Sequence, residues 1–251
     1  MSANLTTILP TYADLWQSSL AWTPDALQQQ QFQILYSRLV EINQQVNLTR
    51  ITTPEDFWEK HLWDSLYGVA PWLTGKLTWK GADIERVIDV GTGGGFPGLP
   101  VAIAQPTWTL TLLDATRKKI QAVQTLAESL DLRDIDFIAD RAEIIGQHPL
   151  HRACYDLALV RAVGPASTCA EYALPLLKMQ GMAVLYRGQW TDTDSEALVP
   201  ALEKLGGEIV ASRQTQTPMT GAERTCLYVQ KTSVTESQYP RDNGVPAKLP
   251  L

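Results

Sequence analysis

The stretch that decides the fold is Val-Ile-Asp-Val-Gly-Thr-Gly-Gly-Gly-Phe-Pro-Gly-Leu-Pro, residues 87–100. A short apolar strand, Val87 to Val90, leads into five glycines within eight residues, and helix-forming sequence resumes at about Leu99. Glycine lets backbone N–H groups approach a ligand closely, and a helix N-terminus attracts a carboxylate or a phosphate. These residues therefore predict a strand, a glycine-rich loop and a helix that together cradle a nucleotide-type cofactor.

Two cofactors compete for this loop. The spacing Gly93-x-Gly95-x-x-Gly98 satisfies the dinucleotide pattern, but that pattern alone discriminates poorly. Asp89, two residues before the first glycine, repels a pyrophosphate and suits a ligand with a cationic amine and a sulfonium. The frame Asp89-x-Gly91-x-Gly93-x-Gly95 resembles motif I of class I S-adenosylmethionine methyltransferases. We therefore favour S-adenosylmethionine over NAD, with a plain glycine-rich turn as the alternative that binds neither.

The length and the cysteine spacing limit the class of protein to which this chain can belong. At 251 residues the chain can form one full α/β core and a small appendage. Its apolar runs are shorter than the roughly 18 residues of a membrane span, and residues 1–4 lack the basic start of a signal peptide. Cys154, Cys169 and Cys226 form no C-x-x-C pair, as is typical of reduced thiols in the cytosol. We expect a cytoplasmic protein with no membrane partner and no metal.

The charge of the chain bears on its partners. The net charge is −6, from 21 Lys and Arg residues against 27 Asp and Glu residues. Because contacts to phosphates need local cations, this balance argues mildly against a nucleic-acid partner. A basic stripe on an acidic body is nevertheless compatible with RNA binding.

Residues 1–75 are predicted to form a helical cap packed on the main domain. Two segments, Thr23-Pro24-Asp25 and Thr53-Pro54-Glu55-Asp56, carry helix start signals: a threonine as N-cap, a proline at the first helical position and an acid in the first turn. Pro71 is expected to end the second helix. Apolar residues recur at helical spacing after each start signal: Leu27, Phe32, Ile34, Leu35, Leu39, Ile42 and Val46, then Phe57, Trp58, Leu62, Leu66 and Val69.

Residues 82–232 alternate between short β-branched runs and helical runs. Such βα units predict a mostly parallel seven-stranded sheet covered on both faces. With the resemblance to motif I, this sheet implies the Rossmann-like class I methyltransferase fold. The last two strands are expected to form an antiparallel hairpin at one edge. A linker is predicted at 75–83 and a C-terminal tail at 233–251. The expected strands are 87–90, 110–113, 136–138, 157–160, 182–186, 208–212 and 227–231; the expected helices are 99–104, 118–130, 165–177 and 194–205.

Two acidic segments follow the second and third expected strands. In an open α/β sheet the ligand lies at the carboxyl ends of the strands, where Asp114 can accept hydrogen bonds from both ribose hydroxyls. The alternative role of Asp114 is to cap the helix through Lys118. Backbone groups of Ala142 and Glu143 can read the edge of the adenine base; the alternative is a solvated charged turn.

The fourth expected strand ends in residues 160–165, where enzymes that methylate an exocyclic amine carry Asp/Asn-Pro-Pro-aromatic. This chain lacks that tetrapeptide, which argues against methylation of an adenine or cytosine amine. Cys154 and Cys169 are poorly placed for a cytosine carbon-5 nucleophile. Arg161 remains at the mouth of the site, where three roles stay open: a structural ion pair, the cofactor carboxylate or an RNA phosphate.

With these segments together, the chain resembles the bacterial RsmG (GidB) family of small-subunit rRNA guanine-N7 methyltransferases. The resemblance spans nearly the whole chain, and His-Leu-x-Asp-Ser-Leu followed by Asp-Val-Gly-Thr-Gly-Gly-Gly-Phe-Pro-Gly is its most specific part. Many members have Lys-Gly where this chain has Arg187-Gly188, which puts the detailed role of Arg187 in doubt. The matching segments are 46–49, 61–66, 89–100, 114–119, 141–143, 161–162 and 239–250.

The resemblance implies S-adenosylmethionine as cofactor and a guanosine in the 530 loop of 16S rRNA as substrate. The partner would be the small ribosomal subunit or its precursor, and we expect a monomer. Motif I contributes Asp89 and Gly93 to the predicted cofactor site. The contacts carried over from the family fall on Gly91, Phe96, Asp114, Ala115, Thr116, Ala142, Glu143 and Arg161.

Guanine N7 has a free lone pair, so its methylation needs no general base, and the sequence identifies no catalytic residue. Arg161 and Arg187 are the candidates for placing the base or a phosphate. We expect the arginines and Lys248 to gather on one face around the cofactor; solvated surface charge is the alternative. A small-molecule methyltransferase and a non-catalytic ribosome-binding factor are the alternative functions. The candidate RNA contacts are Arg50, Lys60, His61, Arg187, Arg241 and Lys248.

Overall fold

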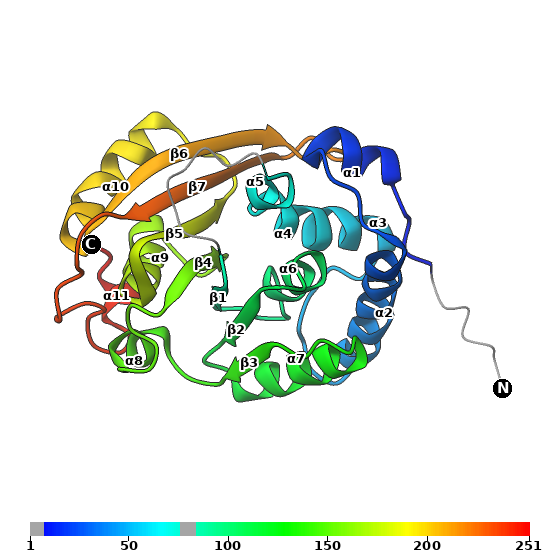
Figure 1. Cartoon of the computed structure of the whole chain (residues 1–251), viewed down its shortest axis with the longest axis horizontal. Helices are drawn as coiled ribbons and strands as arrows, with labels where there is room; N and C mark the ends of the chain where they lie inside the picture. The colour runs from blue at the N-terminus through cyan, green and yellow to red at the C-terminus, as the bar shows by residue number, and fades with distance from the viewer. Residues whose placement is uncertain (1–7, 76–83) are drawn as a thin grey trace.

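A computed structural model describes residues 8–75 and 84–251, and a twisted sheet forms the centre of this part of the chain (Figure 1). Within it the sheet has seven strands in the order β3-β2-β1-β4-β5-β7-β6. Strands β1 to β5 run parallel, whereas β7 is antiparallel to both of its neighbours. The strands are β1 Arg86–Val90, β2 Thr109–Leu113, β3 Ile135–Ile138, β4 Tyr155–Arg161, β5 Leu177–Arg187, β6 Gly207–Gln216 and β7 Glu223–Lys231. The predicted sheet and its edge hairpin are confirmed.

Both faces of the sheet are covered because its central strands are apolar on both sides. Val87 and Ile88 of β1 are fully buried in two different apolar clusters, one on each face. The first cluster includes α6 (Gly98–Ala104) and α7 (Arg117–Ser129). The second includes α9 (Ala166–Ala173), the short 3-10 helix η2 (Leu174–Leu176) and α10 (Asp192–Leu205). Two shorter helices are α8 (Ala142–Gln147) and α11 (Val245–Lys248).

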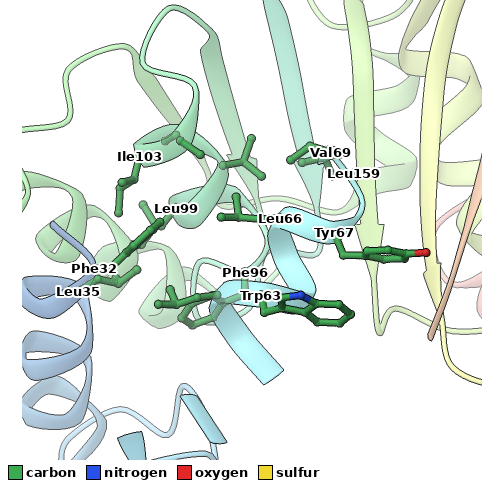
Figure 2. Packing of buried hydrophobic residues seen from close by; sticks show 14 of the residues in the cluster. Phe32, Leu35, Trp63, Leu66, Tyr67, Val69, Phe96, Leu99, Ile103 and Leu159 are labelled. Atoms are coloured by element: carbon green, nitrogen blue, oxygen red, sulfur yellow. The ribbon is translucent and has the colours of Figure 1, made fainter. Parts of the chain in front are cut away.

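The helices of the predicted cap pack on the first of these faces. Phe32 and Leu35 point from the cap toward Leu99 and Ile103 of α6 (Figure 2), and all four are buried in one cluster. The division into a cap and a main domain stays a prediction, since the two share this core. The cap helices are α1 Ala13–Leu20, α2 Ala26–Asn43, α3 Pro54–Phe57, the π-helix η1 Trp58–Trp63, α4 Asp64–Tyr67 and α5 Ala70–Leu73.

The start of α2 differs from the expectation. Its N-cap is Asp25 rather than Thr23: the Asp25 carboxylate accepts from the Gln28 amide, and the Gln28 side chain accepts from the Asp25 amide. This reciprocal pair satisfies two N–H groups at the helix start, which Thr23 is too far upstream to do. Leu27 is 63% exposed and therefore lies off the buried stripe.

Pro71 also behaves differently from the expectation. It lies in the first turn of α5, where a missing N–H costs nothing, and the preceding helix ends at Tyr67. Residues 76–83 of the predicted linker, and residues 1–4, lie outside the described residues. None of the described helices is both long and apolar enough to cross a membrane.

Candidate active site

A cavity of about 660 Å³ opens at the carboxyl ends of β1, β2 and β4. Its size lies within the range of roughly 300–1,000 Å³ that is usual for small-molecule and cofactor sites. Its position, outside the strand ends of an open α/β sheet, is also the usual one. The glycine loop and the ends of β2 and β4 line it, together with cap residues that include His61 and Asp64.

The glycine loop is fixed against the end of β2. The amides of Gly91 and Thr92 donate to the Leu113 carbonyl at 2.8 and 2.9 Å. Gly91 has φ +77°, and a Cβ there would lie 2.6 Å from Val163 Cγ2. Glycine is therefore required at this position both by the backbone conformation and by the close approach of the β4 end.

Asp89 is fully buried beneath this loop and does not line the cavity. Its Oδ2 accepts from the Gly98 amide at 2.8 Å, and burial raises the pKa of the carboxyl to about 6. A Cβ on Gly98 would lie 2.2 Å from Leu112 and 2.8 Å from Asp89 Oδ2, so only glycine allows this contact. Asp89 thus ties the start of α6 to β1, and its direct contact with a cofactor stays a prediction.

Asp114 lies half-buried at the end of β2 and lines the cavity with Ala115 and Gly93. Its Oδ2 accepts from the Gly93 amide at 3.0 Å and its Oδ1 from the Thr116 amide at 2.8 Å. A carboxylate has about four acceptor positions, so two remain for ligand hydroxyls. The N-cap of α7 is Thr116 itself, which does not line the cavity.

Glu143 at the start of α8 is 3% exposed, so the solvated-turn alternative does not describe it. Its Oε1 accepts from Arg141 Nη2, the Tyr172 hydroxyl and the Gly244 amide, at 2.9, 3.2 and 2.9 Å. Burial alone would raise the pKa of Glu143, but the hydrogen bonds from Arg141 and Gly244 outweigh it and lower that pKa. Its Oε2 is buried and has no partner in the described part of the chain. Glu143 and Ala142 both line the cavity.

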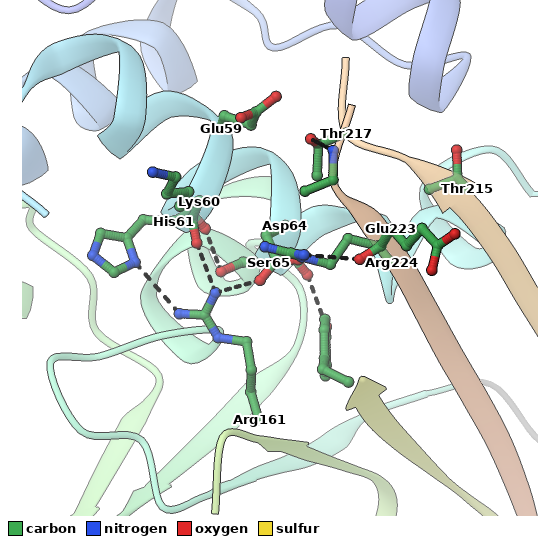
Figure 3. Close-up of polar contacts among 12 residues, drawn as sticks. Glu59, Lys60, His61, Asp64, Ser65, Arg161, Thr215, Thr217, Glu223 and Arg224 are labelled. Atoms are coloured by element: carbon green, nitrogen blue, oxygen red, sulfur yellow. Dashed lines mark hydrogen bonds and ion pairs between the residues drawn. The ribbon is translucent and has the colours of Figure 1, made fainter. Parts of the chain in front are cut away.

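Of the three roles that the sequence leaves open for Arg161, the structure shows the structural ion pair. Its guanidinium donates to Asp64 Oδ2 at 2.7 Å and to the Lys60 carbonyl at 2.9 Å (Figure 3). The opposite oxygen of Asp64 accepts from Arg224 Nε at 2.9 Å. One cap carboxylate therefore joins β4 and β7. Arg161 also lines the cavity, so the ion pair does not exclude a ligand contact.

Sequence reasoning missed Asp64 and Arg224 as site residues. Arg224 is the second residue of β7, and an antiparallel strand begins at the edge where its parallel neighbours end. That rule is the signal that places Arg224 beside the cavity, where it is a lining residue. The sequence pointed to Asp64 only as a member of the His-Leu-x-Asp-Ser-Leu segment, without a role of its own.

His61 and Phe96 stack face to face, with ring centroids 4.0 Å apart and an interplanar angle of 7°. His61 Nε2 also hydrogen-bonds Thr49 Oγ1 at 2.8 Å. Burial and the nearby Arg161 charge lower the pKa of His61 to about 3. The imidazole is therefore neutral at pH 7 and offers an RNA phosphate no positive charge, whereas its ring holds Phe96 in the cavity wall.

The five cations that we expected on one face around the cofactor differ in their contacts. Of Arg50, Arg161, Arg187, Arg241 and Lys248, only Arg161 lines the cavity. Arg187 donates to the Gly164 carbonyl at 2.7 Å and Arg241 pairs with Glu171 at 2.6 Å, because each side chain finds a nearer acceptor. Arg50 and Lys248 are exposed. The basic side chains that do line the cavity are Lys60, Lys119, Arg141, Arg161 and Arg224.

Lys60, like His61, is an RNA candidate that lines the cavity, and it pairs with Asp56 at 2.7 Å. Both side chains are about two-fifths exposed, so the pair is open to exchange with a phosphate. Within residues 8–75 and 84–251 no group of His, Cys, Asp or Glu side chains is arranged to hold a metal ion.

The chain is similar to known proteins over most of its length. Residues 28–220 match the family model of the rRNA small subunit methyltransferase G (GidB). The chain is 51% identical over 247 residues to ribosomal RNA small subunit methyltransferase G of Nostoc punctiforme, covering 98% of this chain and 100% of that one. It is 53% identical over 236 residues to the protein of the same name from Synechococcus elongatus, covering 94% and 95%.

Among solved structures, the cyclase SpnF is similar with a TM-score of 0.51 and 16% identity, covering 83% of this chain and 97% of that one. At this identity the likeness shows the fold alone, because one fold hosts many chemistries. The family model matches well over half of the chain, and the relatives match nearly all of it. The chain belongs to the rRNA small subunit methyltransferase G family.

Proposed function

We propose that this protein transfers a methyl group from S-adenosylmethionine to N7 of a guanosine in the 530 loop of 16S rRNA. The substrate is presented by the small ribosomal subunit or its precursor, and the protein acts in the cytoplasm as a monomer. Membership of the family makes the chain an S-adenosylmethionine-dependent rRNA methyltransferase. The atom, the loop and the assembled substrate are the finer parts of the proposal.

The observation that carries the proposal is one cavity with two carboxylates that keep unused acceptor positions. Asp114 has room for two ribose hydroxyls beyond its bonds to Gly93 and Thr116. Glu143 Oε2, buried without a partner among the described residues, suits the exocyclic amine of an adenine. A buried acceptor left empty is costly, so these residues fit a nucleoside between them.

The remaining cofactor contacts follow the walls of the same cavity. Gly91, Gly93 and Phe96 line it from the loop, and Ala115 and Ala142 line it from the ends of β2 and α8. When bound, S-adenosylmethionine supplies a methyl group activated by a sulfonium. Asp89 contributes indirectly by holding the loop through Gly98. The Thr116 amide orients the Asp114 carboxylate, and a direct contact of Thr116 with the cofactor stays a prediction.

Methylation at N7 requires the protein to position two reactants, and no proton has to be removed from the base. The acceptor lone pair must lie in line with the bond that breaks, and such alignment supplies a large part of the rate acceleration. Arg161, held at 2.7 Å by Asp64, is a fixed donor at the cavity for the base or a phosphate. Arg187 is anchored to Gly164 outside the cavity lining and is assigned to the RNA side.

The charge at the cavity is compatible with an RNA substrate. Five basic side chains line it together with four acidic ones, so the lining has a slight positive excess although the chain carries a net charge of −6. A small-molecule methyltransferase would be expected to enclose its substrate in apolar side chains. Local cations on an acidic body are instead what phosphate contacts require.

The target atom is tested on 16S rRNA from a deletion strain and from the same strain complemented with this chain. Borohydride followed by aniline cleaves RNA at N7-methylguanosine, so cleavage in the 530 loop is expected only after complementation. Purified small subunits treated with methyl-tritiated cofactor should carry the label at the same guanosine. Label in an adenine or a cytosine would contradict the assignment of N7, and unlabelled rRNA would contradict the function itself.

A further inference from the structure

The C-terminal tail, residues 233–251, is anchored to the main domain by two charged side chains. Glu171 is fully buried and accepts from the Arg241 amide, Nε and Nη2 at 2.8, 2.9 and 2.6 Å. Arg152 donates to three tail carbonyls, those of Thr235, Glu236 and Tyr239, at 2.7 to 3.0 Å. Because a buried carboxylate without its partner is strongly unfavourable, these contacts hold the tail in place.

The anchored tail then runs along α8 (Figure 1). A Cβ on Gly146 of α8 would lie 2.6 Å from Pro240 Cγ, so the tail approaches this helix as closely as glycine allows. Gln147 Nε2 donates to the Pro240 carbonyl at 2.9 Å. A six-residue helix has little stability of its own, so its placement depends on such packing.

The same tail reaches the cofactor cavity at two points. The Gly244 amide donates to Glu143 Oε1 at 2.9 Å, and Ala247 lines the cavity. Thr168 Oγ1 of α9 donates to the Pro246 carbonyl between them at 2.8 Å, which fixes this part of the tail. Gly244 has φ +80°, a conformation that a residue with a side chain adopts only under strain.

We propose that the C-terminal tail is a positioning element of the methyl-donor site, in which the Gly244 amide orients the Glu143 carboxylate for the nucleoside. This inference rests on the proposed function, since it assigns the tail to the same cofactor. Arg141 and Tyr172 also hold Glu143 Oε1; the Arg141 side chain is two-fifths exposed, whereas Tyr172 is buried on α9. Gly244 is the partner that the tail supplies, and the buried side chains of Glu171 and Thr168 set its position.

The test compares two glycines that have similar conformations in different places. Gly244→Ala strains the tail at φ +80°, and Gly221→Ala imposes the matched strain at φ +67° in the β6–β7 turn. Gly221 does not line the cavity. Thr168→Val removes the hydroxyl that holds Pro246 and provides a second variant without backbone strain.

The Kd of S-adenosylhomocysteine is measured by calorimetry on the full chain, with thermal melting as the measure of folding. Gly244→Ala is expected to raise this Kd about tenfold, and Thr168→Val to raise it in the same direction. Gly221→Ala should leave it within about twofold while lowering the melting temperature as much as Gly244→Ala does. With small ribosomal subunits as substrate, the KM for the cofactor should rise, and kcat at saturating cofactor should stay within about twofold.

Equal Kd values for Gly244→Ala and Gly221→Ala would overturn the inference, because the effect would then be general strain. If Gly244→Ala does not melt cooperatively, Thr168→Val decides, and a wild-type Kd in that variant overturns the inference. Failure of the wild-type chain to bind S-adenosylhomocysteine would instead contradict the proposed function. The two failures are therefore distinguishable.

Discussion

The nucleotide wall of the cavity (residues 91–96 and Asp114) and its cap wall (Lys60, His61, Asp64, Arg161 and Arg224) are held by different kinds of contact. In the nucleotide wall, Gly93 and Asp114 are 21 positions apart, and Asp89 and Gly98 beneath it are 9 apart. In the cap wall, Asp64 bonds Arg161 across 97 positions and Arg224 across 160.

This difference separates two ways in which the site can fail. The nucleotide wall is one strand–loop–helix unit with its neighbouring strand, so a change there should act mainly on ligand affinity. The cap wall exists only when the cap, β4 and β7 are packed together, so a change there should act on folding and on the site at once. Four predictions test this distinction, in descending order of expected effect.

The largest effect is expected in the cap wall. Asp64→Ala leaves Arg161, which is 15% exposed, and Arg224 without their shared carboxylate. Removing one partner of a largely buried ion pair should lower the free energy of unfolding by about 3 kcal/mol, and methylation should fall with it. Urea denaturation measures the first quantity and tritium transfer the second.

The matched control is Glu41→Ala, which removes the partner of Arg38 in an ion pair whose side chains are 55% and 64% exposed. Such a pair contributes less than about 1 kcal/mol. If Asp64→Ala and Glu41→Ala lower stability equally, the cap wall is not held by its ion pairs and the comparison fails.

In the nucleotide wall, Asp114→Ala should weaken cofactor binding by roughly 1.5–3 kcal/mol, the range for hydrogen bonds to a charged acceptor. Calorimetry with S-adenosylhomocysteine measures this loss, and NAD should bind neither protein. Asp131→Ala, which removes an 81% exposed carboxylate, is the control and should bind as the wild type does. An unchanged affinity in folded Asp114→Ala would contradict the assignment of Asp114 to the ribose hydroxyls.

The two candidate arginines should differ in which step they impair. Arg161→Ala and Arg187→Ala are each expected to lower methylation of the ribosomal substrate at least tenfold, about 1.4 kcal/mol in the transition state. Cofactor affinity should fall for Arg161→Ala, whose side chain lines the cavity, and far less for Arg187→Ala. Parallel measurements of kcat/KM and of S-adenosylhomocysteine binding check this, and equal losses of affinity would contradict the assignment of Arg187 to the RNA side.

The smallest expected effect is the change in folding stability with pH that Asp89 causes. Its pKa is raised to about 6 by burial, so the folded protein binds a proton that the unfolded chain releases above about pH 4. A carboxyl with a raised folded pKa destabilises the folded state at neutral pH, and that cost disappears as the pH falls from about 6 to about 4.

Asp89→Asn keeps a carbonyl oxygen for the Gly98 amide and removes the titration. The stability of the wild type relative to this variant should therefore rise by at least about 1 kcal/mol between pH 7 and pH 4. Denaturation at both pH values measures the difference. A constant difference would show that folding leaves the pKa of Asp89 unchanged.

The sequence predicted the sheet well because its signals are local. All seven strands lie where short apolar runs were expected, and α6 begins within one residue of the predicted start at Leu99. The helical cap was predicted less accurately. Its exposed Leu27 satisfied the periodicity, and its Pro71 begins a helix rather than ending one. Periodicity reports which residues share a helix face, but not which part of that face meets the core.

The sequence by itself determined the fold class, the family and the nucleotide wall, because a strand, a glycine loop and an acidic strand end are each specified by neighbouring residues. Only the tertiary structure decided which cations line the cavity. Arg187 donates to the Gly164 carbonyl and Arg241 pairs with Glu171. Arg224, in contrast, donates to Asp64 at the cavity. A long charged side chain has many rotamers, and its partner depends on which acceptor the packing brings within about 3 Å.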